Sequence, residues 1–299
     1  MKILLTGHNG LVGSAILNEI DCVTYPNRIN DQKPFEEFLM DNKIDTVIHT
    51  AGKVGGLQTN FENKIDFYIE NSKLNNIVFE SCYKNKIQNL INFSSTCVFP
   101  DAIEYPLTED KVFQGPPHFS NDAYAYSKRM MQMLCRLARE DGLNYTTLMP
   151  TNIFGENDNF NLYHGHVLPA LIHKCYLAKQ NNTEFVIWGS GLPLREFVYS
   201  ADVAKIVKDL LCKKINYDSL IVSSSREITI ANCAKLIAKF MKYDAKIIFD
   251  TSKPEGQFRK PTNNLRLKSV LPNFEFTNFE FALENSVNWF IENYSTLRK

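Results

Sequence analysis

The sequence predicts an α/β fold, in which a doubly wound parallel sheet is followed by a smaller C-terminal α/β domain. A glycine-rich loop, Gly7–Gly13, lies between a short apolar run and a helix-like run. Strand-like and helix-like runs then alternate regularly as far as residue 155, as in parallel sheets with right-handed crossovers. The alternation weakens beyond that point. We therefore expect a first domain over residues 1–155, with a returning segment at about residues 196–225, and a second domain over residues 156–299.

The first strand and the loop after it are typical of a dinucleotide site. Lys2–Thr6 is predicted to be a buried strand, and Gly7, Gly10 and Gly13 follow it before a helix over residues 14–20. Glycines permit a tight turn and close approach of the backbone, and the helix N-terminus receives the pyrophosphate. The spacing is one residue longer than Gly-x-Gly-x-x-Gly, and a glycine-rich turn without a ligand is the alternative. We predict a Rossmann-type, dinucleotide-binding first domain.

The second predicted strand, Cys22–Tyr25, bears on the choice between NAD and NADP. An acidic residue at its end would hold the adenosine ribose hydroxyls of NAD, and a basic residue would hold the 2′-phosphate of NADP. Arg28 follows this strand, and no carboxylate occurs before Asp31. This favours NADP, with Arg28 as the phosphate contact, although a solvated surface arginine is the alternative.

The remaining elements of the first domain follow in order. We predict helices over residues 35–42, 64–84 and 122–139, and strands over residues 45–50, 89–93 and 144–149. The loop Ala51–Gly56 leaves the third strand at the carboxyl edge of the sheet, where ligands bind in doubly wound folds. The fourth strand ends at Ser94 and Ser95, where a hydroxyl could hydrogen-bond a substrate carbonyl.

Tyr124 and Lys128 are predicted to share a face of the last of these helices, because residues at i and i+4 are neighbours. A nearby cation favours the phenolate and is expected to lower the pKa of the phenol from about 10. A phenol beside a lysine is what an enzyme needs to protonate an alkoxide as hydride arrives at a ketone. Since this spacing arises about once by chance in such a chain, the motif is weak alone.

The second half shows less regular elements. Residues 158–165 are predicted to form a loop, residues 185–188 a strand, and residues 167–179, 202–213, 229–242 and 278–293 helices. A turn at residues 189–191 precedes residues 194–199. We interpret this half as a substrate domain that sends segments back across the sheet.

The composition excludes several classes of function. The chain has 33 Lys and Arg and 33 Asp and Glu, whereas a nucleic-acid-binding protein would carry a basic excess. Its seven cysteines include no Cys-x-x-Cys pair, which indicates reduced thiols and neither disulfides nor a metal site. The N-terminal apolar run is too short for a signal peptide, and no run approaches the roughly 20 apolar residues of a membrane span. We expect a cytoplasmic protein without nucleic-acid or membrane partners.

Eight stretches, in order from Thr6 to Lys260, carry a resemblance to a known family: "TGHNGLVGSAI", "AGKVGG", "SSTCVFP", "YAYSK", "MPTNIFGENDNF", "HVLPALI", "VIWGSGLPLREFVYSADVA" and "KPEGQFRK". They resemble the GDP-L-fucose synthases, or GDP-4-keto-6-deoxy-D-mannose epimerase/reductases, of the extended short-chain dehydrogenase/reductase superfamily. The resemblance covers nearly the whole chain. It implies an NADP-dependent oxidoreductase that reduces the C4 ketone of a GDP-4-keto-6-deoxy sugar, with the sugar nucleotide bound by the second domain.

The resemblance also implies catalytic roles. Ser95, Tyr124 and Lys128 match the reductase set, with NADPH as hydride donor, and Lys128 would also hold the nicotinamide ribose. Cys97 and His166 match the acid/base pair that epimerises C3 and C5. A thiol and an imidazole titrate near neutrality and can remove and return the acidic protons beside a ketone. The alternatives are a small buried apolar residue at Cys97 and a structural histidine at His166.

Two sets of binding residues follow from the same resemblance. The cofactor set comprises Gly7, Asn9, Gly10, Leu11, Val12, Gly13, Arg28, Ala51, Ser94, Lys128, Pro150, Asn152, Ile153 and His166. The set that lines the GDP-sugar cleft comprises Asn152, Lys174, Trp188, Arg195, Glu255 and Lys260. Cations such as Lys174 and Arg195 suit a diphosphate, and Trp188 offers a flat apolar surface.

Several residues depart from the family pattern. Lys174 replaces a common arginine, Glu255 a common aspartate, and Thr96 and Phe99 are unusual within "SSTCVFP". Such changes around the sugar leave open a different sugar, including a heptose, whose reductases within the family act without epimerising.

Two other functions remain open. One is an epimerase or dehydratase of nucleotide sugars that retains NAD, which the missing acidic residue at the second strand disfavours. The other is a non-catalytic dinucleotide-sensing protein on the same fold, which the presence of all five candidate catalytic residues disfavours. The resemblance further implies a homodimer formed by the two long helices, and a role in nucleotide-sugar biosynthesis for surface glycans such as capsular polysaccharide.

Overall fold

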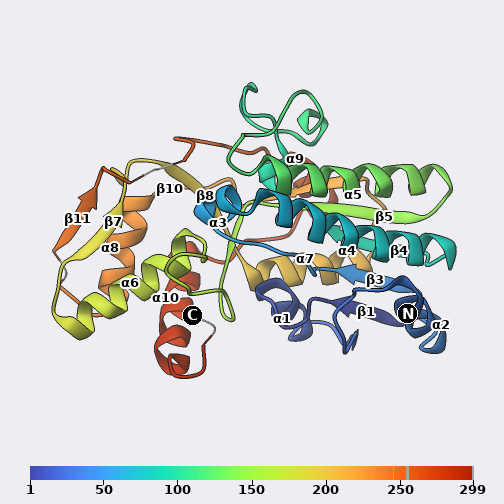
Figure 1. Ribbon diagram of the computed structural model, residues 1–299, viewed down its shortest axis with the longest axis horizontal. Coiled ribbons are helices and arrows are strands. Elements are labelled where there is room, and N and C mark those ends of the chain that lie inside the picture. Colours follow the sequence, from blue (N-terminus) through green and yellow to red (C-terminus); the bar gives the residue numbers. More distant parts are fainter. Residues whose placement is uncertain (245, 254–255, 298–299) are drawn as a thin grey trace.

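The largest unit of the protein is a parallel sheet of six strands (Figure 1). The computed structural model describes residues 1–244, 246–253 and 256–297. The strand order is β2-β1-β3-β4-β5-β9, and every neighbouring pair is parallel. Its strands are β1 (Ile3–Thr6), β2 (Val23–Thr24), β3 (Thr46–His49), β4 (Asn89–Phe93), β5 (Asn144–Pro150) and β9 (Ser219–Val222). The central strands are buried almost throughout, as expected for a parallel sheet covered on both faces.

Helices cover both faces of this sheet. On one face pack α2 (Gln32–Asp41), α4 (Lys64–Lys84) and α5 (Asp122–Glu140), whose apolar residues form a core with β1, β3, β4 and β5. On the other face pack α1 (Leu11–Leu17), α7 (Ser200–Cys212) and α9 (Leu265–Val270). The short helix α3 (Leu57–Glu62) precedes α4. This layering places the loops after the strands at one edge of the sheet.

The strand order reverses between β1 and β3. From β1 the chain runs outward to β2 and then returns to pair β3 with the other side of β1, with Leu4 opposite Val23 and Val47. The loops Gly7–Gly10 and Ala51–Gly56 leave the two strands at this point. A topological switch point is where ligands bind in open α/β sheets.

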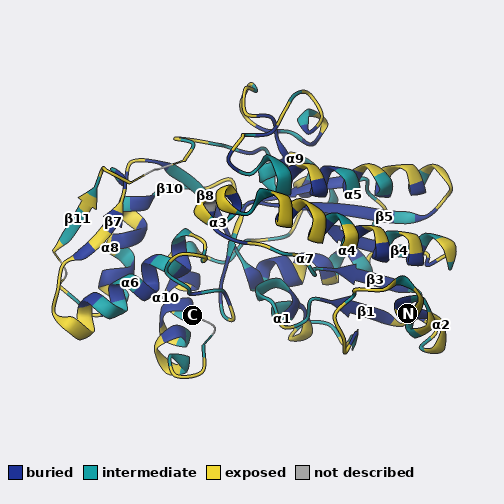
Figure 2. Ribbon diagram, in the orientation of Figure 1, coloured by how far each residue is buried: buried dark blue, intermediate teal, exposed yellow. Residues whose placement is uncertain are grey.

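The second unit contains two small sheets (Figure 1). One has the order β10-β8-β6, from Glu227–Thr229, Leu194–Tyr199 and Asn152–Phe154, and the other pairs β11 (Ile247–Asp250) with β7 (Phe185–Trp188). The helices α6 (Val167–Asn181), α8 (Ile230–Phe240) and α10 (Phe279–Asn293) pack around one apolar core with them. Figure 2 shows the buried faces of these helices turned toward one another.

The predicted elements are largely confirmed. The helix over residues 64–84 and the strands over residues 89–93 and 185–188 have the expected bounds, and most others differ by three residues or fewer at an end. The helix α3 was not predicted, because it is short and follows a glycine loop. The returning segment supplies β9, which completes the large sheet. No helix among the described residues is long and apolar enough to cross a membrane.

Candidate active site

Tyr124 and Lys128 lie one turn apart on α5, beside the carboxyl end of β4. The Lys128 Nζ lies 5.8 Å from the centre of the Tyr124 ring, and it donates a hydrogen bond to the Phe93 carbonyl at 2.9 Å. Phe67 on α4 packs edge-on against the Tyr124 ring, with 6.4 Å between centroids. The predicted shared face is confirmed, and the lysine is anchored to the sheet.

Burial dominates the electrostatics of this pair. It raises the pKa of Tyr124 above its ordinary value, and the nearby Cys97 side chain adds to the rise. Burial also lowers the pKa of Lys128 to about 8. The prediction that Lys128 lowers the pKa of Tyr124 is therefore wrong in this structure. The apolar surroundings disfavour the phenolate more than an ammonium directed at the Phe93 carbonyl stabilises it.

A buried polar chain, which the sequence analysis missed, connects β1 to the residue before Lys128. Thr6 Oγ1 lies 2.8 Å from His49 Nδ1, His49 Nε2 lies 3.1 Å from Asn75 Oδ1, and Asn75 Nδ2 donates to the Ser127 carbonyl at 3.2 Å. Burial, followed by the charge of Lys128, lowers the pKa of His49 to about 3, so the imidazole is neutral. The sequence offered one signal for this chain of hydrogen bonds, because His49 and Asn75 are polar residues within a predicted strand and a predicted helix.

Ser95 and Cys97 occupy the turn that follows β4. The Cys97 backbone N–H donates to Ser95 Oγ at 3.2 Å, so Ser95 caps the short 3₁₀ turn Thr96–Val98 that carries the thiol. Both side chains are partly buried. The Cys97 side chain is close enough to Tyr124 and Lys260 to interact with both electrostatically.

His166 immediately precedes α6, at a loop that meets the switch point. The Gly56 N–H donates to the His164 carbonyl at 2.9 Å, and a Cβ at Gly56 would lie 2.5 Å from the Gly165 oxygen. His164 Nδ1 also lies 2.9 Å from Thr59 Oγ1. His166 is exposed at the surface, but the protein atoms around its side chain partly desolvate it, and this desolvation lowers its pKa. The loop contacts therefore bring a neutral imidazole to the edge of the sheet beside Ala51–Gly56.

Gly7 and Gly13 make the backbone cradle that the glycine spacing predicts. Gly7 has a φ of +74°, and a Cβ there would lie 2.6 Å from the Ala51 nitrogen. A Cβ at Gly13 would lie 2.2 Å from the Gly7 oxygen. The Gly10 N–H donates to the Gly7 carbonyl at 3.0 Å, which closes the turn, and Gly10 is the N-cap residue of α1. A Cβ at Gly7 or Gly13 would collide with backbone atoms, so only glycine lets the turn and the start of α1 pack this closely.

The residues around this cradle fit a dinucleotide. Three buried polar atoms, His8 Nδ1, Ser94 Oγ and Thr151 Oγ1, have no hydrogen-bond partner within the described parts of the chain. Such atoms cost free energy unless a ligand or water satisfies them. Asn9 and Arg28 are exposed, and Arg28 follows β2, the neighbour of β1. The other predicted cofactor residues lie at the same edge of the sheet or in β6: Leu11, Val12, Ala51, Pro150, Asn152 and Ile153.

Lys174 and Trp188 form the far end of the predicted substrate cleft. The Lys174 Nζ lies 4.2 Å from the centre of the Trp188 ring system, and the Lys253 Nζ, which the sequence analysis missed, lies 5.7 Å from it. Lys174 and Trp188 line a groove of about 260 Å³ between α6 and β7. Burial lowers the pKa of Lys174, and the carboxylate of Asp250 opposes this effect. Cations around an exposed indole suit an anionic ligand with a planar ring.

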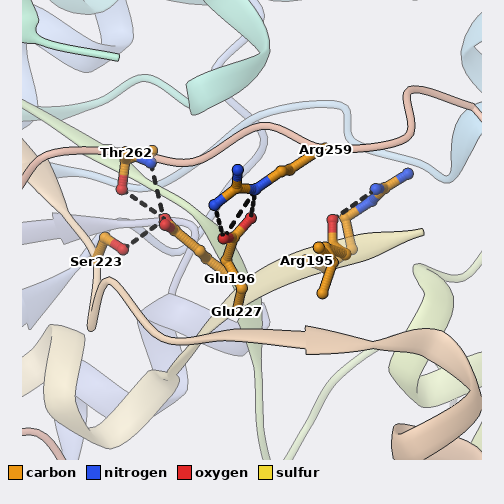
Figure 3. Close-up of polar contacts among 7 residues, drawn as sticks. Arg195, Glu196, Ser223, Glu227, Arg259 and Thr262 are labelled. Atoms are coloured by element: carbon orange, nitrogen blue, oxygen red, sulfur yellow. Dashed lines mark hydrogen bonds and ion pairs between the residues drawn. The ribbon is translucent and has the colours of Figure 1, made fainter. Parts of the chain in front are cut away.

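Arg195 and Lys260 lie on neighbouring segments. Arg195 is on β8 and donates from Nη1 to the Leu194 carbonyl at 2.8 Å (Figure 3). It also donates from Nη1 to the Phe258 carbonyl at 3.5 Å. Burial lowers the pKa of Lys260, while Cys97 and Asp101 oppose the shift. Asn152 begins β6 and donates to the Glu196 carbonyl at 2.8 Å.

Two of the residues that depart from the family pattern, Phe99 and Glu255, are not found at a sugar site in the described part of the structure. Phe99 is fully buried in an apolar cluster with Leu107, Met149 and Ile221, so this departure from the family pattern lies in the core and not around a sugar. Glu255 lies outside the described residues.

Comparisons with known proteins identify the family. The sequence profile of the NAD dependent epimerase/dehydratase family matches residues 3–219. The GDP-L-fucose synthase of Dictyostelium discoideum is 41% identical over 99% of this chain and 97% of its own. The probable GDP-L-fucose synthase of Drosophila melanogaster is 34% identical over 100% of this chain and 99% of its own. The crystal structure of a GDP-L-fucose synthetase from Naegleria fowleri bound to NADP superimposes with a TM-score of 0.90, at 39% identity, over 99% of this chain and 96% of that one.

These matches extend from end to end of the chain, and they include both small sheets as well as the large one. Sequence, fold and site geometry agree, and the chain belongs to the NAD dependent epimerase/dehydratase family and, within it, to the enzymes of the GDP-L-fucose synthase family.

Proposed function

We propose that this protein is an NADPH-dependent reductase of the C4 ketone of a GDP-4-keto-6-deoxy sugar. The observation that carries the proposal is the placement of Tyr124 and Lys128 on α5 beside the switch-point cradle of Gly7 and Gly13. The relative from Naegleria fowleri, which is 39% identical, was solved with NADP. When bound, NADPH supplies the hydride. Arg28 would contact its 2′-phosphate, and Lys128 its nicotinamide ribose.

Tyr124 is the proton donor to the alkoxide oxygen in this proposal. Its raised pKa keeps the phenol protonated at neutral pH, as a donor requires. Ser95, at the end of β4, would hydrogen-bond the substrate carbonyl and the phenol together. Lys128, held by the Phe93 carbonyl, stabilises the phenolate that remains after proton transfer.

Cys97 and His166 are the acid/base pair for epimerisation at C3 and C5. His166 has a lowered pKa, so it is neutral and can accept a proton at neutral pH. Cys97 lies near Tyr124, on the short turn that Ser95 caps. The two residues come from different segments, since Cys97 lies in the turn after β4 and His166 immediately before α6. Without a contribution from this pair, the enzyme would be a C4-reductase that follows a separate epimerase, for a hexose or a heptose.

The sugar nucleotide would lie between the two units. Lys174, Trp188, Arg195 and Lys260 supply cations and a flat apolar surface for GDP. Such a product would serve the synthesis of surface glycans in the cytoplasm. The competing function is that of an epimerase or dehydratase that retains NAD, and the nucleotide released by denaturing the purified protein distinguishes the two by mass.

We further infer a homodimer through α4 and α5. Ile65 and Ile69 on α4 are 74% and 57% exposed, and Met133 and Leu137 on α5 are 40% and 41% exposed. Each pair lies one turn apart on its helix, and α4 packs along α5, so both helices carry exposed apolar side chains. Exposed apolar side chains that gather on one surface mark protein–protein interfaces.

The mass of the product formed from GDP-4-keto-6-deoxy-mannose and NADPH in deuterated water tests the function. Deuterium at C3 and C5 supports an epimerase/reductase, and its loss in Cys97→Ser and His166→Gln proteins that still bind NADPH supports the assigned pair. A reduced product without deuterium supports a bare C4-reductase. No reduction of this sugar or of the corresponding heptose overturns the proposal.

A further inference from the structure

Glu196 is a buried carboxylate in the middle of β8, directly after the substrate cation Arg195. Its side chain is embedded, with only 4% of the residue exposed. Oε2 accepts hydrogen bonds from Ser223 Oγ at 2.7 Å and from Thr262 Oγ1 at 2.5 Å, and Oε1 accepts one from the Thr262 N–H at 3.0 Å (Figure 3). A carboxylate is costly to bury unless donors of this kind satisfy its oxygens. Three hydrogen bonds therefore satisfy both oxygens of the buried side chain.

The partners of Glu196 belong to three different parts of the fold. Ser223 follows β9, the last strand of the large sheet, and Thr262 belongs to the C-terminal segment that carries Lys260. The Glu196 carbonyl accepts the Asn152 side-chain N–H from β6 at 2.8 Å. One residue thus connects the large sheet, the small sheet and the C-terminal segment.

The C-terminal segment 258–263 is fixed on two sides. The Leu194 N–H donates to the Phe258 carbonyl at 2.9 Å, which ties the start of the segment to β8. The Leu107 N–H donates to the Pro261 carbonyl at 2.9 Å, and the Asn263 N–H donates to the Leu107 carbonyl at 2.8 Å. Lys260 lies between these ties in the chain, close enough to Arg195 for the two charges to interact.

A second ion pair on the same segment allows a matched comparison. Arg259 donates to both oxygens of Glu227 on β10, at 2.9 and 3.0 Å from Nε and 2.5 Å from Nη2 (Figure 3). The Arg259 side chain is 53% exposed. Exposed pairs contribute little, because water solvates the separated charges. Glu196 also accepts hydrogen bonds from this segment through a carboxylate, but its side chain is excluded from water.

We propose that Glu196 is a positioning residue for the sugar nucleotide. Its carboxylate locks segment 258–263 to β8, so that Lys260 and Arg195 face the substrate from one rigid wall. The inference rests on the proposed function for its kinetic readout. It predicts that loss of the acceptor weakens sugar-nucleotide binding and leaves the NADPH site intact, because the cofactor cradle of β1 and α1 lies in a different part of the fold.

The experiment compares Glu196→Leu, Glu196→Gln, Thr262→Val and Glu227→Gln with the wild type. Glu196→Leu should raise the KM for the sugar nucleotide by about tenfold or more, with the Kd for NADPH changed by less than about twofold. Glu196→Gln should restore most of the affinity, because its carbonyl accepts the Thr262 N–H while both hydroxyls turn to accept from its amide. Thr262→Val, a milder change, should raise the KM by a smaller factor, and Glu227→Gln should leave it unchanged.

Amide hydrogen exchange of residues 258–263 in the substrate-free protein gives a second readout that needs no activity. Faster exchange in Glu196→Leu and Thr262→Val, but not in Glu227→Gln, supports the lock even if the sugar proves to be another one. Unchanged exchange with unchanged KM overturns it. An equal loss of NADPH affinity also overturns it, since that pattern indicates a general loss of structure.

Discussion

The Lys128 ammonium lies 5.8 Å from the centre of the Tyr124 ring and donates to the Phe93 carbonyl at 2.9 Å. The lysine is therefore held by the sheet and not by the phenol. The buried chain from Thr6 through His49 and Asn75 fixes the backbone carbonyl of the residue before it. This arrangement keeps a cation close to the phenol while the phenol stays protonated.

Replacement of Tyr124 by Phe removes the proposed proton donor and leaves the ring in place. We expect kcat for ketone reduction to fall by about 10²–10⁴, the usual contribution of a general acid. NADPH binding, measured by the quenching or enhancement of its fluorescence, should be retained, because the phenol does not form the glycine cradle. Reduction at the native rate by the Tyr124→Phe protein would exclude the proposed donor.

The lowered pKa of Lys128 predicts an alkaline limit to activity. Since the charged lysine is the active form, kcat/KM should decline as the pH rises through about 8. Lys128→Arg, whose guanidinium stays charged, should lower the rate but move this decline to higher pH. A profile that declines at the same pH in both proteins would assign the limit to another group.

The lowered pKa of Lys128 should affect stability in the opposite direction to activity as the pH rises. Between about 8 and the ordinary lysine value of 10.5, the unfolded chain binds a proton that the folded chain does not. Stability therefore rises with pH across this window for the wild type. Urea unfolding at pH 8 and pH 10 should show a smaller rise for Lys128→Met, whose side chain does not titrate.

A side chain at Gly13 should abolish cofactor binding. In Gly13→Ala the added Cβ would lie 2.2 Å from the Gly7 oxygen, which is backbone and cannot turn aside. The turn must open, and the thermal stabilisation that NADPH gives the wild type should disappear. Gly115→Ala is a control for the general effect of an added methyl group, since neither Gly115 nor Gly13 has a positive φ and a Cβ at Gly115 would lie 3.4 Å from its nearest neighbour, the Pro100 Cβ. Retained stabilisation in Gly13→Ala would show that the cofactor lies elsewhere.

If the protein is a homodimer through α4 and α5, Ile65→Lys should convert it into a monomer. Ile65 is 74% exposed on α4, so a lysine there should not disturb the fold of the single chain, but it would bury a charge in the interface. Sedimentation should give a dimer for the wild type and a monomer for the variant. Leu265→Lys, a change of another exposed apolar residue on α9, should remain dimeric. A monomeric wild type would contradict the interface.

Local sequence patterns were sufficient to predict the α/β fold, the cradle and the catalytic helix. Gly7 and Gly13 have spacings that a turn with close backbone contact requires, and Tyr124 and Lys128 have a spacing that any helix converts into a shared face. The helix Lys64–Lys84 and the strand Asn89–Phe93 followed from periodicity alone. These features depend on residues near one another in the chain, so the sequence determines them directly.

Tertiary structure alone decided the electrostatics and the long-range contacts. Burial raises the pKa of Tyr124 where the Tyr-x-x-x-Lys spacing predicted a decrease, because desolvation depends on surroundings from distant segments. His49, Asn75 and Glu196 acquire their roles from partners 26 to 66 residues away. A residue of this kind has no local signature. Its chemistry exists only after the chain has brought its partners together and excluded water from them.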